Sequence, residues 1–420
     1  MTETLDTKPP EGARRAAFAF IFVTILLDMM AVGIIIPVLP RLVTSFVGGD
    51  ARRGAEIFGV FGVVWALMQF LFTPVMGSLS DRFGRRPVIL ISNLGLSLDY
   101  VLMALAPSLA WLFVGRVISG ITAASISTGS AYIADVTPPD KRAGAYGLLG
   151  LAFGLGFILG PAIGGLLGHQ DPRLPFWCAA GFSFVNFMYG LLILPESLAP
   201  GLRAPFRWRM ANPIGALELL RSRPGLLGLS VVIFLSNLSH VVLPAVFVLY
   251  ADYRYDWDAR QVGLCLAAVG ASSAVVQGLL VRPLVKRLGE RRVMLFGLVC
   301  GALGFAIYGL APTGSLFLCA VPVMALWGLA SPSTQGLMTR RVEPTEQGRL
   351  QGAVSSLTGL AGLIGPLLFT QTFAIFIGPK LRLPGAPFLL ASFLMVLAVA
   401  VAFRAPGEAG GEGLATAESG

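Results

Sequence analysis

Long apolar runs separated by short charged segments constrain this chain more than any other feature of its sequence. Two such runs, residues 57–76 and 87–106, flank residues 77–86, a segment that carries three arginines and two glycines. Each run is about 20 residues long, and a helix of that length crosses the ~30 Å hydrocarbon core of a bilayer because it rises ~1.5 Å per residue. The sequence therefore predicts two antiparallel membrane-spanning helices joined by a tight turn.

The composition extends this prediction to the whole chain. Hydrophobic residues make up 55% of its 420 residues and charged residues only 13%, about half the share that is typical of soluble domains. The basic excess, a formal net charge of +9, lies in the predicted loops, so it does not require a nucleic-acid partner. We therefore predict an all-α integral membrane protein.

The sequence lacks the usual signatures of an enzyme or a metal site. It contains no nucleotide-binding loop and no nucleophile elbow. The cysteines lie in apolar runs without pairing or ligand spacing, and the two histidines form no cluster; these residues are Cys178, Cys265, Cys300, Cys319, His169 and His240. We therefore expect neither enzymatic activity nor a cofactor or bound metal.

Twelve apolar stretches are long enough to cross a membrane as helices. They cover residues 16–39, 55–76, 87–107, 109–133, 143–168, 175–194, 224–250, 259–281, 293–311, 315–336, 348–377 and 384–404. The longest connection is rich in Arg and Pro and divides the helices six and six. We predict an N-terminal segment (1–15), a six-helix bundle (16–194), a linker (195–223), a second six-helix bundle (224–404) and a disordered tail (405–420). The linker is expected to contain a surface helix near residues 212–220.

Positive charges predict the orientation of these spans. Loops and termini on one side hold 22 of the 31 Lys and Arg residues, those on the other side hold 8, and Arg116 lies within a span. Since Lys and Arg concentrate on the cytoplasmic side, both termini are expected in the cytoplasm. The first apolar run is too long for a signal-peptide core, so we expect a multi-pass protein of the inner (cytoplasmic) membrane that retains this run.

The two halves of the chain resemble each other at a constant offset of 205 residues. Gly84 falls on Gly289, and the Gly160-Pro161 pair falls on Gly365-Pro366 without any gap. This is the pattern of a duplicated six-helix unit, an architecture that places a substrate site between its halves and works by rocking one half against the other.

The same offset pairs charged residues of opposite sign. Asp81 falls on Lys286, Arg85 on Glu290, and Asp135 on Arg340. We interpret these residues as two charge clusters that attract each other when the cytoplasmic side is closed; the alternative is that loop charges vary and serve only orientation.

Three ionisable residues lie inside predicted spans, where each costs ~2.5–3.5 kcal/mol on insertion scales. Asp28 and Asp99 each lie about 12 residues into a helix, ~18 Å from one face, and Arg116 lies at a similar level. A carboxylate that moves between dry and wet environments can bind and release a proton. We predict that Asp28 is the protonation site and that Arg116 modulates it. The alternative is a static buried ion pair that holds the helices together. For Asp99, a role in helix packing and a role in transport are both open.

Small and amide residues mark further candidate positions. Small residues along one predicted helix permit close packing against a neighbouring helix, and a proline among them can kink it. In the first half these residues are Gly156, Gly160, Pro161, Gly164 and Gly165. The pattern recurs in the second half at Gly362, Gly365 and Pro366. These helices are predicted to line the rocking seam, or else simply to pack. Amides within spans need a partner or water; Gln69, Gln277, Gln335 and Asn237 are the candidates for substrate binding, with Asn93 and Asn186 as further polar positions.

Several segments resemble the major facilitator superfamily, in particular its twelve-helix drug/proton antiporters. The resemblance lies in Gly77-x-Leu79-x-Asp81-Arg82-x-Gly84-Arg85-Arg86, in residues 116–120, and in Gly156-x-x-x-Gly160-Pro161-x-x-Gly164-Gly165. With the repeat, it covers nearly the whole chain. It implies the fold of that superfamily, and it implies that Gly77, Arg86 and the charged residues of the first cluster belong to a cytoplasmic gate in which Arg85 bridges to Asp135.

Within the superfamily the sequence is similar to tetracycline/proton antiporters. The similarity lies at Asp28 with residues 37–40, at Asp99-Tyr100, at residues 131–135 and 288–292, and at residues 350–352 and 365–369. It implies proton-coupled export of a small amphipathic compound by alternating access, in a protein functional as a monomer. The family's coupling histidine and second-half aspartate align with Ser273 and Gly301, so export of another drug or metabolite with altered coupling is an alternative, and a transporter-like receptor is a further one.

Overall fold

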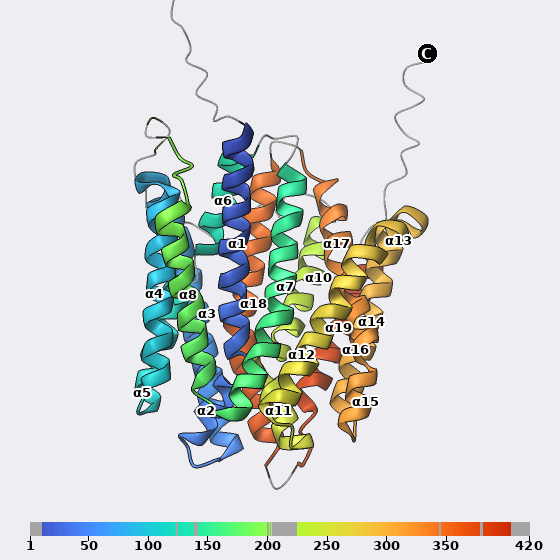
Figure 1. Ribbon diagram of the computed structural model, residues 1–420. Helices are drawn as coiled ribbons and strands as arrows, with labels where there is room; N and C mark the ends of the chain where they lie inside the picture. Colours follow the sequence, from blue (N-terminus) through green and yellow to red (C-terminus); the bar gives the residue numbers. More distant parts are fainter. Residues whose placement is uncertain are drawn as a thin grey trace, which may run out of the picture. The chain divides into compact units, whose positions relative to one another are not determined.

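The structure of the chain is a computed structural model that describes residues 11–122, 125–137, 142–199, 201, 203, 225–343, 346–378 and 381–404 (Figure 1). Within these ranges all regular secondary structure is helical. The predicted tail, residues 1–10 and most of the predicted linker, including its surface helix, lie outside the described residues.

Eleven helices in the described part are long and apolar enough to cross a membrane, and Leu109–Thr122 is a shorter apolar helix. The first half contains α1 (Glu11–Ile35), α2 (Leu39–Ser45), α3 (Ala51–Phe83), α4 (Arg85–Leu105), α5 (Leu109–Thr122), α6 (Ser125–Val136), α7 (Arg142–Gln170) and α8 (Leu174–Ile193). The second half contains α10 (Leu226–His240), α11 (Val242–Tyr255), α12 (Ala259–Val275), η5 (Val276–Leu280), α13 (Val281–Leu288), α14 (Glu290–Leu310), α15 (Gly314–Cys319), α16 (Val321–Leu326), η6 (Trp327–Leu329), α17 (Ala330–Thr339), α18 (Gln347–Phe376) and α19 (Ala386–Arg404). This is the all-α membrane architecture that the sequence predicts.

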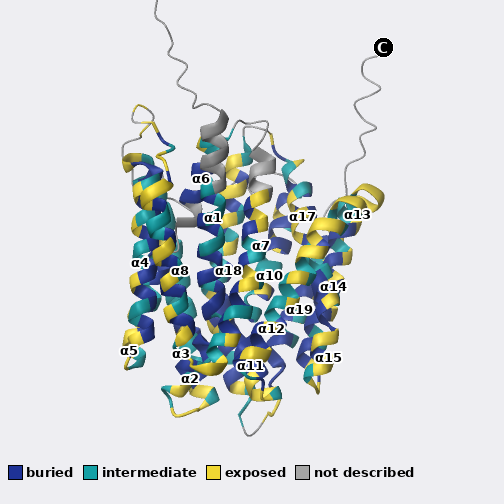
Figure 2. Ribbon diagram, in the orientation of Figure 1, coloured by how far each residue is buried: buried dark blue, intermediate teal, exposed yellow. Residues whose placement is uncertain are grey.

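Large apolar side chains remain exposed on the outer faces of these helices (Figure 2). Ile91 and Leu98 on α4 are 66% and 62% exposed, and Leu192 on α8 is 78% exposed. Apolar surface of this kind is rare on soluble monomers, and it is the surface that a lipid bilayer covers.

The helix pairs that pack together in the first half recur in the second half. In the first, α1 packs against α7 and α8, and α4 packs against α8. In the second, α10 packs against α18 and α19, and α14 packs against α19. Since α1, α4, α7 and α8 correspond in order to α10, α14, α18 and α19, the duplication inferred from the 205-residue offset extends to tertiary packing.

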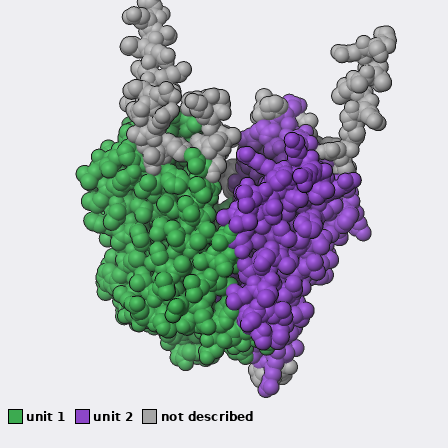
Figure 3. Space-filling view, turned by 45° about the vertical axis from the view of Figure 1, so that its right-hand side comes forward, with its two compact units in different colours: residues 1–211, 251–271 green, residues 212–250, 272–420 purple. Residues whose placement is uncertain are grey.

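The helices divide into two compact units, coloured green and purple in Figure 3. Unit 1 contains residues 1–211 and 251–271, and unit 2 contains residues 212–250 and 272–420. The segment 251–271 follows the predicted bundle boundary in sequence yet packs with unit 1. The reason is close contact of α12 with α7: a Cβ at Gly165 would lie 2.5 Å from the carbonyl oxygen of Ala259 and 2.9 Å from the Cα of Gly263.

The predicted tight turn over residues 77–86 is wrong in its extent. Helix α3 continues through Phe83 and α4 begins at Arg85, so the reversal takes place at Gly84 alone. Gly84 has φ +106°, a conformation that L side chains rarely adopt, which explains how one residue turns the chain. The signature residues from Gly77 to Phe83 therefore lie on a helix that continues beyond the apolar run.

Other predicted single helices are interrupted within the described residues. The predicted helix 224–250 breaks between His240 and Val242. The predicted helix 109–133 is described as α5 and α6, and residues 123–124 between them lie outside the described residues. The predicted helix 259–281 passes through the π-helical segment η5 and continues as α13 to Leu288. Apolar patterning reports burial and length, and it does not register a local change of helical pitch.

Candidate functional site

Asp28 lies on the buried side of α1 and is only 6% exposed. Its Oδ1 accepts a hydrogen bond of 2.8 Å from Nδ2 of Asn186 on α8. The same amide nitrogen donates to the carbonyl oxygen of Thr24 at 3.0 Å. Asn186 is fully buried, so α8 supplies a fixed hydrogen-bond donor to a carboxylate in the middle of the span.

Arg116 has Asp99 as a charged neighbour, and its predicted role as a modulator of Asp28 stays a prediction. Arg116 lies within electrostatic range of Asp99 and makes no hydrogen bond to it in the described part of the chain, and its guanidinium lies over the Trp65 ring at 5.4 Å from the centroid. Asp99 is 1% exposed, and its two carboxylate oxygens make no hydrogen bond within the described part of the chain. Gly115 allows the backbone of α5 to lie close to Asp99, because a Cβ at position 115 would lie 2.8 Å from Asp99 Oδ1.

Tyr100 connects the two acidic positions. It is 1% exposed and lies within electrostatic range of Asp28, Asp99 and Arg116. The three ionisable residues predicted from the sequence therefore gather around one buried tyrosine of α4, as two separate pairs: Asp28 with Asn186, and Asp99 with Arg116.

A second group of charges surrounds Arg85 at the start of α4, and we call it the Arg85 cluster. Arg85 Nε donates to Oδ2 of Asp135 at 3.1 Å, and its Nη1 donates to Ser80 Oγ at 2.7 Å and to Asp81 Oδ1. The Arg85 side chain is 11% exposed. The bridge between Arg85 and Asp135 is the contact that the sequence predicts. A Cβ at Gly77 would meet no described atom within 4 Å, so the glycine is not required by packing here.

Glu196 is a member of this cluster that sequence reasoning missed. Its Oε1 accepts from the backbone N–H of Arg85 at 2.9 Å, and its Oε2 accepts from the backbone N–H of Arg86 at 3.3 Å. It thereby caps the N-terminus of α4, where unpaired N–H groups and the helix dipole favour an anion. A Cβ at Gly84 would collide with this carboxylate. The sequence did contain a signal for this role, because Glu196 closely follows the predicted span 175–194 and lies on the same predicted side of the membrane as Arg85 and Arg86.

The second half contains the sign-reversed counterpart, the Glu290 cluster. Glu290 is the first residue of α14, and its Oε1 accepts from Nη2 of Arg340 at 3.0 Å. A Cβ at Gly336 would lie 2.7 Å from Glu290 Oε1. The pair Glu290–Arg340 thus occupies the positions that Arg85–Asp135 occupies in the first half, with the charges exchanged.

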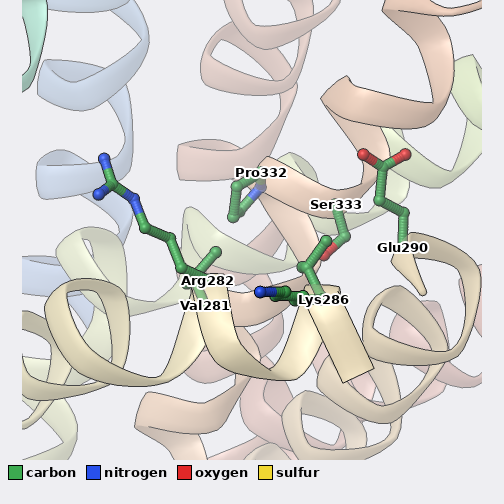
Figure 4. A pocket seen from close by; sticks show the side chains of 7 residues that line it. Val281, Arg282, Lys286, Glu290, Pro332 and Ser333 are labelled. Carbon is green, nitrogen blue, oxygen red and sulfur yellow. The ribbon is translucent and has the colours of Figure 1, made fainter. Parts of the chain in front are cut away.

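Lys286, the third predicted member, lines a cavity with Glu290. This cavity has a volume of about 310 Å³, and the side chains around it come from α13, α14 and α17 (Figure 4). They are Val281, Arg282, Val285, Lys286, Glu290, Pro332 and Ser333. Among the residues that the structure describes, Glu290 is ion-paired with Arg340 and Lys286 forms no ion pair with it, so the second cluster differs from the first, in which Asp81 contacts Arg85.

The predicted small-residue surface of α7 contacts α1. A Cβ at Gly160 would lie 2.8 Å from both the Gly33 Cα and the Met30 carbonyl oxygen, and one at Gly33 would lie 2.9 Å from Pro161 Cδ. Cβ atoms at Gly156 and Gly164 would collide with Met29 and Ile34. Gly165, the next residue along α7, contacts α12, so two adjacent sides of this helix depend on glycine.

The corresponding helix in the second half is α18. Its Gly365 packs against Val241, whose Cβ would lie 2.6 Å from a Cβ at position 365. Pro366 lies inside the helix and is buried. The Gly-Pro pair therefore marks a close helix contact in each half, as the 205-residue offset predicts.

The candidate substrate-binding amides differ in their surroundings. Asn237 donates to the Ile233 carbonyl oxygen of its own helix at 2.9 Å, which satisfies one of its amide hydrogens. Gln277 and Gln335 are exposed, Gln69 is half-buried, and Asn93 is fully buried with no hydrogen bond to described residues. Within the described part of the chain, Asn186 is the one of these six amides that hydrogen-bonds to a predicted mid-span ionisable residue.

These features define a class: an all-helical, multi-pass membrane protein with repeated helix packing, mid-span carboxylates and a sign-reversed pair of charge clusters. The family model of the Major Facilitator Superfamily matches residues 21–366 and, in a second match, residues 229–418. The chain belongs to this superfamily, whose members are transporters.

Named relatives cover most of the chain. Tetracycline resistance protein, class C, from Escherichia coli is 37% identical over 358 residues, which are 85% of this chain and 90% of that protein. Tetracycline resistance protein, class E, also from Escherichia coli, is 39% identical over 354 residues, 84% of this chain and 86% of the relative. The crystal structure of nucleoside transporter NupG is 14% identical, with a TM-score of 0.74 over 92% of this chain and 98% of that chain, and it supports the fold.

Proposed function

We propose that this protein exports tetracycline or a closely similar amphipathic compound in exchange for protons, by alternating access. One observation carries the proposal: the chain is 33–39% identical to several tetracycline resistance proteins over at least 83% of its length. The buried carboxylate of Asp28 supplies a group for proton exchange in this scheme.

Asp28 is the proposed proton carrier. A carboxylate in the middle of a span is stable when it is neutralised or hydrogen-bonded, and here Asn186 provides a hydrogen bond of 2.8 Å. Helix movement that separates the two groups or admits water changes the stability of the charged form, so one conformation binds a proton and the other releases it. Export of the drug and entry of the proton are then coupled by the same movement.

The Asp99–Arg116 pair has a different proposed role. Arg116 is the opposite charge within electrostatic range of Asp99, and this attraction favours a fixed position of α4 against α5. We propose that Arg116 acts on Asp28 indirectly, through the position of α4 and Tyr100.

The two charge clusters are the proposed gate. The Arg85 cluster ties the turn between α3 and α4 to the end of α6, and the Glu290 cluster makes the equivalent tie in the second half. Asp81 is the residue proposed to interact with the N-terminus of α18 in the closed state, because a helix N-terminus favours an anion. Loss of these charges is expected to slow the conformational exchange and to preserve substrate binding.

We further propose that the protein lies in the inner (cytoplasmic) membrane with both termini in the cytoplasm. The asymmetry of Lys and Arg over the loops supports this orientation. Protons and the exported small molecule are the proposed transport partners, a monomer is the proposed functional unit, and no enzymatic step is needed.

Everted membrane vesicles test this function. Respiration acidifies the vesicle lumen, and an antiporter then releases luminal protons when tetracycline is added. We expect wild-type vesicles to lose part of their pH gradient on addition of tetracycline, and Asp28→Asn vesicles to keep it. Asp50→Asn is the matched control, because Asp50 caps α3 through Oδ1, an acceptor that asparagine retains, and its other contact is an exposed ion pair with Arg53 at 3.9 Å.

Three outcomes of this experiment separate the claims. A wild-type protein that gives no proton release with tetracycline overturns tetracycline export. Proton release by Asp28→Asn equal to that of wild type overturns the role of Asp28 and leaves the export function in place. Release by other compounds in a panel, without tetracycline, supports the second candidate, an exporter of another drug with altered coupling. The presence of Ser273 and Gly301 at the positions where the resemblance implies coupling residues favours that candidate. Trp327 packs against Gly301, since a Cβ there would lie 2.9 Å from the indole.

A further inference from the structure

Two short segments of unit 2 that are not α-helical lie next to each other. The span Ala259–Leu288 becomes a π-helix over Val276–Leu280, and the span Gly314–Thr339 tightens to a 3-10 turn over Trp327–Leu329. A Cβ at Gly328 would lie 3.7 Å from Gln277 Cγ and 3.8 Å from its Nε2, so Gln277 lies against the 3-10 turn. Such interruptions recur at functional sites, and at membrane depth they are tolerated where they pack in protein or line a water-filled space.

An aromatic pair lies beside this crossing. The ring centroids of His240, the last residue of α10, and Trp327 are 5.5 Å apart, with 48° between the ring planes. Trp327 Nε1 donates to Ser236 Oγ at 3.1 Å, one helical turn before His240. This bond fixes the orientation of the indole relative to the imidazole.

All three side chains lie near the middle of their spans. His240 follows the start of its span, Leu226, by about 21 Å of helix, and Trp327 lies about 20 Å from Gly314. Gln277 lies about 17 Å before the end of its span at Leu288. They therefore share a level at which a transported compound crosses the bilayer.

The polar members of this group are exposed although they lie deep in the protein. His240 and Gln277 are exposed and Trp327 is half-buried. A polar side chain exposed at mid-span faces water, a ligand or lipid, and contact with lipid is the costly option. The group is therefore available to water or to a ligand.

Trp327 also occupies the place next to Gly301. A Cβ at position 301 would lie 2.9 Å from both Cδ1 and Cγ of the indole. The indole therefore fills the space beside this glycine in the middle of α14.

We propose that His240, Trp327 and Gln277 form a recognition face for a planar, multi-ring compound that carries hydrogen-bonding oxygens. The ring system of the compound packs on the imidazole and the indole edge, and the Gln277 amide hydrogen-bonds to one of its oxygens. This inference rests on the proposed function, because it names the surface that holds the exported compound. It adds His240 and Trp327 to the residues that determine specificity.

Binding to the purified full-length protein tests the proposal with tetracycline as the probe. Loss of an aromatic stacking partner or of a hydrogen bond to the ligand is expected to raise Kd about tenfold, so Trp327→Leu, His240→Leu and Gln277→Leu should each bind about tenfold more weakly than wild type. Trp327→Phe retains an aromatic ring and should lose less. The matched controls are Trp111→Leu, an aromatic residue 51% exposed on α5, and His169→Leu at the end of α7, both expected within about twofold of wild type.

A second measurement keeps the test decisive where a variant folds poorly. Tetracycline bound to the wild-type protein is cross-linked by light, and the labelled peptides are identified. Label on peptides that contain residue 240 or 327 supports the recognition face, and label confined to other peptides overturns it. Equal Kd for wild type and for Trp327→Leu and His240→Leu also overturns it, with the export function intact. A wild-type protein that neither binds tetracycline nor releases protons with it overturns the proposed function instead.

Discussion

Arg85 donates from Nε to Oδ2 of Asp135 at 3.1 Å, and 205 residues later Glu290 accepts from Arg340 at 3.0 Å. The two bonds have the same place in the two repeats and opposite polarity. A duplicated unit keeps such a pair only if both members change together, because a single reversal would put like charges in contact. The two bonds therefore form a matched set with complementary signs.

This relationship predicts that the first pair can be exchanged. Arg85→Glu and Asp135→Arg alone should each slow tetracycline-driven proton release in everted vesicles about tenfold or more, because each leaves two like charges together. The double variant recreates the polarity of the Glu290 cluster within the first half, and it should recover part of the rate. Tetracycline binding should stay near the wild-type value in all three. A double variant no faster than the single ones would show that the pair has no exchangeable role.

Helix α7 predicts a steric distinction between two of its glycines. A Cβ at Gly164 would collide with the backbone of Ile34, whereas a Cβ at Gly154 meets no described atom within 4 Å. Gly164→Ala should cost about 1–3 kcal/mol of stability because the α1 contact must open. Gly154→Ala should be neutral or slightly stabilising, since alanine favours helix. Thermal unfolding in detergent compares the two, and equal unfolding temperatures would contradict the close α1–α7 contact.

The Asp99–Arg116 pair predicts a non-additive effect on stability. Arg116→Ala leaves the Asp99 carboxylate buried without its counter-charge, which should cost about 3–5 kcal/mol. Combining Arg116→Ala with Asp99→Asn removes the orphaned charge and should restore most of that loss. The measurement is the unfolding midpoint of the three variants in one detergent. A double variant less stable than Arg116→Ala would mean that the two charges do not compensate each other.

Glu196 predicts a capping effect outside the apolar spans. Its carboxylate accepts hydrogen bonds from the backbone N–H groups of Arg85 and Arg86, so Glu196→Ala should cost about 0.5–2 kcal/mol. Hydrogen exchange of the first turn of α4 should rise in the variant and remain unchanged in the core of that helix. Glu56→Ala is the control, because Glu56 makes only a surface ion pair with Arg52. Exchange that is unaltered at residues 85–88 would contradict the cap.

Much of the fold was predictable because it depends on local pattern. Apolar runs of span length, the 205-residue offset and the sign reversal at Asp81, Arg85 and Asp135 are all properties of residue order. The prediction that Arg85 bridges to Asp135 succeeded because the two residues carry opposite charges and lie at helix ends on the same predicted side of the membrane. The extent of the turn at Gly84 was not predictable, since helices continue beyond the hydrocarbon as long as their backbone bonds are satisfied.

The partners of the buried charges were less predictable. Depth along a helix placed Asp28, Asp99 and Arg116 at one level, but it did not say which helix faces which. The orientation of α5 about its own axis places Arg116 near Asp99 and Trp65, and α8 contributes Asn186, which hydrogen-bonds to Asp28. Glu196 was missed for a similar reason, because it lies 111 residues from Arg85 in sequence.

The sequence by itself determined that this protein is a duplicated set of membrane-spanning helices with charged clusters and three ionisable residues in its spans. These features follow from the hydrophobicity, spacing and repetition of residues along the chain, which do not depend on tertiary contacts. Only the tertiary structure decided how those charges pair, that residues 251–271 pack on α7, and that Trp327 fills the place beside Gly301. Such choices depend on how side chains of distant helices fit together, and a linear pattern does not record the rotation of one helix against another.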